Sequence, residues 1–78
     1  EQSEVQIYPN PTDAILNIQS NGVELLSVSV YDNMGRLLLT KSVNQEKSEL
    51  DVSQLSLGTY YLQVVTTKEV LQYKVLKK

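Results

Sequence analysis

Hydrophobic and polar residues alternate along most of the chain. The alternation is clearest over residues 26–31, where Leu26, Val28 and Val30 are separated by serines. A period of two places successive apolar side chains on one face of an extended strand. No segment keeps the 3.6-residue period of a helix. The pattern predicts seven strands, over residues 5–8, 16–19, 26–31, 36–43, 49–52, 60–66 and 70–76.

Turn-forming residues separate these strands at intervals of about ten residues. The predicted turns are residues 9–13, 20–22, 32–35, 44–48, 57–59 and 67–69, and all but the last contain Gly, Pro, Asn, Asp or Ser. Short strands at this spacing predict an all-β fold, an immunoglobulin-like antiparallel β-sandwich of about seven strands. The inward-facing residues expected to form its core are Ile7, Leu16, Ile18, Val28, Val30, Leu62 and Val64.

Residues 51–55 are the predicted crossover from one sheet to the other, and the next strand begins at Tyr60. Asp51 or Ser53 is suited to cap a single turn there. Gly58 is expected to need both backbone freedom and a close approach of the chain. Tyr60, which follows, resembles a tyrosine corner, in which a buried Tyr donates its hydroxyl to the upstream backbone. An ordinary strand tyrosine is the alternative interpretation.

Composition restricts the chemistry that is available. A chain of 78 residues suffices for one small domain. It has no Cys and no His, which removes the thiolate nucleophile, the imidazole base, the Cys/His zinc site and the disulfide framework. No cofactor is expected. The net charge of −2 and a pI near 4.9 disfavour nucleic-acid binding, and no apolar run reaches the ~18 residues of a membrane span.

The acidic residues of the turns do not indicate catalysis. Asp13, Asp32 and Asp51 lie where Asp is common because its side chain bonds nearby backbone. A glycosidase would need two carboxylates across a cleft, and residues 32–35 lack the ligand spacing of a calcium loop. The sequence therefore predicts neither an enzyme nor a metal site.

Two turns have a clear physical basis. Pro9 and Pro11 fix φ and lack an amide donor, so they end the first strand. In the next hairpin Asp32 can bond the backbone two residues on, Gly35 can adopt a positive φ, and Arg36 can pair with Asp32. An exposed pair contributes about 0 to 1 kcal/mol, which leaves a role of Arg36 beyond stability open.

Four segments form an ordered set of motifs. Residues 8–18 contain Pro-Asn-Pro before an alternating strand, and residues 30–38 contain Tyr-Asp-x-x-Gly-Arg. Residues 50–62 contain Leu-x-x-Gly-x-Tyr, and residues 74–78 form a short basic and apolar terminus. In this order and spacing, almost the whole chain resembles the C-terminal sorting domains of cargo proteins of the bacterial type IX secretion system.

The resemblance implies a non-enzymatic signal that directs an upstream cargo protein across the outer membrane to the cell surface or the medium. The implied partners are the outer-membrane translocon, a cargo-shuttling outer-membrane barrel protein and a surface sortase. The sortase would cut before Val5 and link the cargo to a lipopolysaccharide anchor. Residues 1–4 would be the end of a linker and residues 5–78 the sorting domain. The family-motif residues are Pro9, Asn10, Pro11, Tyr31, Asp32, Gly35, Arg36, Gly58, Tyr60, Lys74, Val75, Lys77 and Lys78.

The last strand allows two interpretations. Residues 70–78 contain three lysines and no acid. Lysines along an edge strand discourage edge-to-edge aggregation, and the same edge can serve as a recognition surface. The alternative function for the whole domain is an immunoglobulin-like adhesive or ligand-binding module of a cell-surface protein, because composition and strand pattern fit it equally well.

Overall fold

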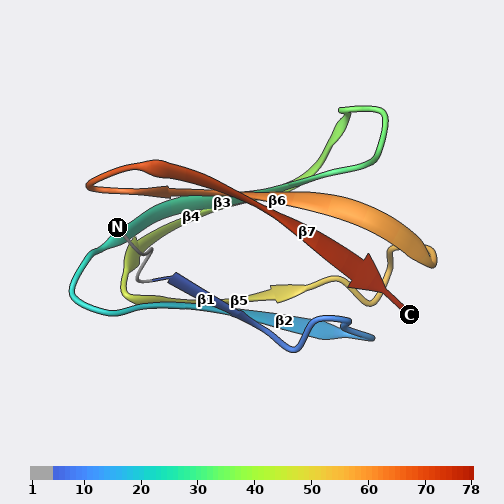
Figure 1. Cartoon of the computed structure of the whole chain (residues 1–78), viewed down its shortest axis with the longest axis horizontal. Helices are drawn as coiled ribbons and strands as arrows, with labels where there is room; N and C mark the ends of the chain where they lie inside the picture. Colours follow the sequence, from blue (N-terminus) through green and yellow to red (C-terminus); the bar gives the residue numbers. More distant parts are fainter. Residues whose placement is uncertain (1–4) are drawn as a thin grey trace.

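The computed structural model describes residues 5–78, so the predicted linker over residues 1–4 lies outside it. Two antiparallel sheets pack face to face (Figure 1). One sheet has the order β1 (Val5–Tyr8), β2 (Ile15–Ser20), β5 (Lys47–Asp51). The other has the order β4 (Leu37–Gln45), β3 (Leu25–Tyr31), β6 (Gly58–Thr66), β7 (Val70–Lys77). The predicted immunoglobulin-like β-sandwich of seven strands is confirmed.

The core lies between the two sheets. Six of the predicted core residues are at most 3% exposed, namely Leu16, Ile18, Val28, Val30, Leu62 and Val64. Ile7 is only half-buried and packs at the margin of the core, because β1 is an edge strand. Other residues of the predicted strands, such as Leu50 and Val75, are buried as well, although they were not among the core residues named.

The predicted alternation is wrong at the start of β3. The register shifts between Leu25 and Ser27, where the strand bulges. Leu25 is fully buried, whereas Leu26 is 37% exposed. A bulge sets two residues against one on the neighbouring strand, so the apolar face moves by one position.

The predicted turn over residues 44–48 is also wrong. β4 continues to Gln45 and β5 begins at Lys47, although the two strands belong to different sheets. Asn44 has a φ of 60°, a left-handed conformation that Asn tolerates better than most residues. The chain therefore changes sheets within a residue or two. After β5 it returns to the four-stranded sheet through the crossover predicted after Asp51.

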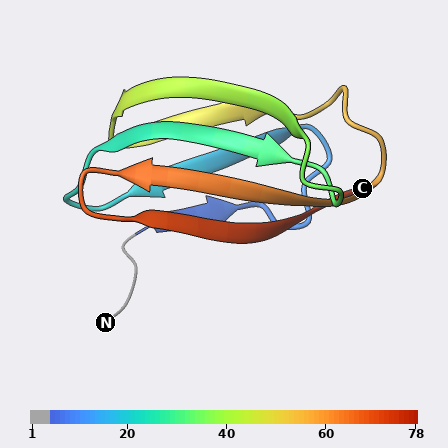
Figure 2. The same cartoon turned by 90° about the horizontal axis from the view of Figure 1, so that it is seen from above.

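The two ends of the sandwich carry different segments (Figure 2). The β1–β2, β3–β4 and β5–β6 connections lie at one end together with the last residues of β7, because Gly58 pairs with Lys77 and Tyr31 with Tyr61. We call this the motif end, made of residues 9–14, 32–36, 52–57 and 74–78. β1 begins at the opposite end.

Over residues 5–78, no helix has the length and apolar character needed to cross a membrane.

Candidate functional site

The β3–β4 hairpin is built around the carboxylate of Asp32. Its Oδ1 accepts the backbone N–H groups of Met34 and Arg36, each at 2.9 Å, and its Oδ2 accepts Nε–H of Arg36 at 2.7 Å. Gly35 has a φ of 86°, and its N–H donates to the Asp32 carbonyl at 3.0 Å. The predicted ion pair and the predicted positive φ are both confirmed.

These bonds hold the pKa of Asp32 below its usual value of 3.8. The largest cause is the hydrogen bond from the Arg36 backbone; burial acts in the opposite direction, and the bonds from the Arg36 side chain and the Met34 backbone lower it further. The Asp32 side chain is 13% exposed and that of Arg36 is 74% exposed. Asp32 therefore serves as an anchor, while Arg36 presents its guanidinium to solvent.

Tyr60 forms the predicted tyrosine corner. Its hydroxyl donates to the Ser56 carbonyl at 2.7 Å and lies 3.3 Å from the Ser56 hydroxyl. The residue is 8% exposed. Between these residues Gly58 has a φ of 149°, but a Cβ there would meet no atom within 4 Å. The corner needs the backbone freedom of glycine, and the predicted close approach is wrong.

The turn before the corner is capped by Asp51, one of the two residues predicted for this role. Its Oδ1 accepts the Ser53 backbone N–H at 2.9 Å and the Ser53 hydroxyl at 2.6 Å. The bond from the hydroxyl, followed by the bond from the backbone, lowers the pKa of Asp51. The Leu55 N–H closes the turn by donating to the Val52 carbonyl at 3.0 Å. This carboxylate is also used for local structure.

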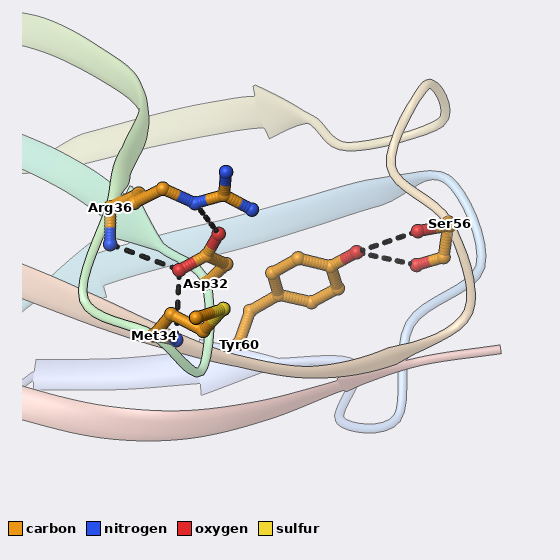
Figure 3. A network of polar contacts seen from close by, with 5 residues as sticks. All are labelled: Asp32, Met34, Arg36, Ser56 and Tyr60. Carbon is orange, nitrogen blue, oxygen red and sulfur yellow. Dashed lines mark hydrogen bonds and ion pairs between the residues drawn. The ribbon is translucent and has the colours of Figure 1, made fainter.

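The hairpin and the corner lie side by side (Figure 3). Between them is a groove of about 430 Å³, lined by Asp32 and Arg36 on one side and by Ser56, Gly58 and Tyr60 on the other. Exposed apolar side chains of Met34 and Leu57 stand at this end, 78% and 75% exposed. Two motif segments that are about 20 residues apart in sequence thus form one surface feature.

Tyr31 lies outside this groove. It is half-buried on the outer face of the four-stranded sheet, opposite Tyr61, which in turn pairs with Lys74. Tyr31 and Tyr61 line a second hollow together with Asp32 and Gly35. Tyr31 is therefore next to the hairpin but faces a different side of the motif end.

The Pro9–Asn10–Pro11 segment lies against the end of β7. The peptide bonds before both prolines are cis. The Asn10 Nδ2 donates to the Lys74 carbonyl at 3.0 Å, and the Leu76 N–H donates to Asn10 Oδ1 at 3.1 Å. The first and last motif segments, far apart in the sequence, are thus in direct contact.

Thr12 extends this contact along β7. Its N–H donates to the Leu76 carbonyl and its carbonyl accepts the Lys78 N–H, both at 2.9 Å. It forms a parallel bridge with Lys77. Lys74 and Lys78 are exposed and Lys77 is half-buried, whereas Val75 is 5% exposed and belongs to the core. Val75 anchors β7, and the lysines form the surface.

Sequence reasoning missed two residues of the motif end. Thr12 is 1% exposed, and its hydroxyl donates to the Ile15 carbonyl at 3.0 Å. A threonine in a proline-containing turn carries no sequence signal of burial. Ser56 receives the Tyr60 hydroxyl through its backbone carbonyl, a group that every residue has, so its identity could not reveal the role.

The chain matches a known protein family. The model of the family described as "Secretion system C-terminal sorting domain" matches residues 6–78. The match includes all four motif segments and the strands that connect them. The comparison with curated proteins finds no matching sequence.

Proposed function

The chain belongs to the family of type IX secretion-system C-terminal sorting domains, and from this premise we propose that its motif end is the surface that the export machinery recognises. In this proposal the folded domain is a non-catalytic signal that takes an attached upstream protein across the outer membrane. The observation that carries the proposal is the convergence of the four motif segments on one end of the sandwich.

The polarity of the sandwich supports this assignment. β1 begins at Val5, at the end opposite to the motif end. A cargo protein joined through the N-terminal side of the chain would therefore be attached away from the motif residues. The groove beside Arg36 and the lysines of β7 would stay accessible while the cargo is attached.

The proposed partners follow from the family. They are the outer-membrane translocon, a cargo-shuttling barrel protein of the outer membrane and a surface sortase. In this scheme the sortase cuts before Val5 and links the cargo to a lipopolysaccharide anchor, so that the cargo ends at the cell surface. The export machinery would bind the motif end before that cut, and the sortase would cut the chain near the opposite end.

A reporter fusion tests the proposed function. An inert reporter that carries its own signal for export across the inner membrane is joined ahead of residues 1–78 and expressed in a type IX-competent cell and in a matched strain without the translocon. We expect the reporter at the surface or in the medium of the first strain and in the periplasm of the second. An adhesive module would leave it in the periplasm of both strains, and that result would refute the proposal.

A further inference from the structure

The side chain of Asn10 takes the place of a neighbouring strand on the outer edge of β7. A carboxamide carries an N–H donor and a carbonyl acceptor, as a peptide group does. Asn10 uses both, donating to the Lys74 carbonyl and accepting the Leu76 N–H. The backbone of Thr12 continues the series with its bonds to Leu76 and Lys78. An exposed polar side chain thus begins a ladder that main-chain groups complete.

This ladder fixes the end of β7 from both sides. The other edge of β7 pairs with β6 without interruption from Val70 to Lys77. On the outer edge, the bonds to Asn10 and Thr12 engage the Lys74 carbonyl, both backbone groups of Leu76 and the Lys78 N–H. We call residues 10–12 together with residues 74–78 the terminal junction. It joins the loop after β1, a strand of the three-stranded sheet, to the edge of the four-stranded sheet.

We propose that the terminal junction is one composite recognition surface and that Asn10 is its positioning residue. This inference rests on the proposed function. The junction carries Lys74, Lys77 and Lys78, and residues 70–78 contain no acid. It therefore fits a carboxylate-rich surface of the export machinery. A backbone held in place before binding presents the ammonium groups with less conformational entropy left to lose.

Asn10 is suited to position the lysines without being required for the fold. Asn10 is exposed, and both of its bonds are exposed to solvent. The two backbone bonds of Thr12 and the burial of Val75 do not depend on its amide. Loss of the amide should loosen the end of β7 locally and leave the sandwich formed.

The test compares Asn10→Ala with Asn17→Ala. Asn17 is a matched control, because its Nδ2 also donates to a backbone carbonyl, that of Tyr8 at 3.2 Å, on β1 rather than β7. In the chain alone, we expect the Leu76 amide to exchange its hydrogen at least about tenfold faster in Asn10→Ala, with the Val64 amide unchanged. Asn17→Ala should leave both amides at their wild-type rates.

The reporter fusion supplies the second measurement. We expect export to fall at least about fivefold in Asn10→Ala and to stay normal in Asn17→Ala, while Tm shifts by less than about 5 °C in both. A larger fall in Tm would overturn the inference, because Asn10 would then be needed for the fold itself.

Two other outcomes would also overturn it. Unchanged Leu76 exchange in Asn10→Ala would show that the amide does not hold β7. Fast exchange with normal export would leave Asn10 as a cover for the strand edge, seen as self-association at high protein concentration. Failure of the proposed function is distinguishable, because the wild-type fusion would then not be exported, whereas the exchange result would stand.

Discussion

The β3–β4 hairpin and the terminal junction both belong to the motif end, but they are held by bonds of very different range. Every side-chain bond of the Asp32 carboxylate joins residues at most four positions apart. The two bonds of Asn10 join residues 64 and 66 positions apart. The hairpin can form from its own five residues, whereas the junction requires that both sheets have assembled.

The hairpin surface is therefore determined by its local sequence, whereas the surface of the terminal junction exists only when the whole domain is folded. The bonds of the Asp32 carboxylate join only residues within 32–36. The terminal junction cannot form until β7 lies beside β6 and the β1–β2 loop has reached its edge. Machinery that contacts the junction would thereby distinguish a folded domain from an unfolded one.

The largest effect is expected from Leu62→Ala, which should remove both regions together. Leu62 is 1% exposed on β6, the strand that pairs with both β3 and β7. The cavity and the lost burial should cost about 2 to 4 kcal/mol of unfolding free energy, a large part of the stability of so small a domain. Urea unfolding followed at the Arg36 and Leu76 amides should give one shared transition.

Leu57→Ala, at a residue 75% exposed, is the control and should change stability by less than about 0.5 kcal/mol. Two separate transitions would contradict the account.

Gly35→Val should damage the hairpin alone. Gly35 has a φ of 86°, and a Cβ there would meet no atom within 4 Å. The expected cost of about 1 to 3 kcal/mol is therefore backbone strain and not a clash. Gly35→Asn should cost less, since Asn tolerates positive φ. Thermal melts compare the two variants, and Leu76 exchange should stay slow in both. Equal Tm values for Val and Asn would refute the assigned strain.

Tyr60→Phe should cost about 1 kcal/mol, the value of one partly buried hydrogen bond. The substitution removes the bond to the Ser56 carbonyl and keeps the packing of the ring. Tyr61→Phe is the matched control, because Tyr61 is 41% exposed on the outer face and lies outside the corner. Equal Tm values for the two variants would show that Tyr60 is an ordinary strand tyrosine.

Acid should weaken the hairpin and spare the terminal junction. Bonds to the Asp32 carboxylate lower its folded pKa below 3.8, so their contribution is complete above the unfolded pKa and is lost as pH falls through the folded one. The junction is held by neutral amide and peptide groups. Between neutral pH and about pH 2, the amide chemical shift of Arg36 should therefore show a transition, whereas that of Leu76 should not. Asp32→Asn should abolish the Arg36 transition. A shared acid transition at both amides would contradict this prediction.

The strand pattern of the sequence predicted the fold because burial on one face of a strand follows a period of two. It failed where a backbone irregularity changed that period. The bulge after Leu25 shifted the apolar face, and the left-handed Asn44 let β4 run almost directly into β5. Leu is common in regular strands and Asn is common in ordinary turns, so neither residue type by itself identifies a bulge or a change of sheet.

The motif end was predictable to the extent that its bonds are local. The pairing of Asp32 with Arg36, the cap at Asp51 and the corner at Tyr60 all join residues within four positions and were expected from turn chemistry. The contact of Asn10 with β7 was not, because nothing in an exposed turn specifies which distant strand will lie against it. The resemblance to sorting domains, confirmed by the family match, led to the predicted motif residues but gave nothing of their arrangement.

The most direct test of recognition at the motif end compares the removal of two lysine charges there with the removal of two lysine charges at the opposite end of the sandwich. In the reporter fusion, Lys77→Ala with Lys78→Ala alters the motif end, and Lys47→Ala with Lys68→Ala alters the opposite end. Both pairs should leave Tm within about 5 °C of wild type, because these side chains lie outside the core. The account predicts that the exported fraction collapses for the motif-end pair, stays normal for the opposite-end pair, and recovers when Lys77 and Lys78 are replaced by Arg. Normal export of a folded motif-end variant, or an equal loss from both pairs, would contradict it.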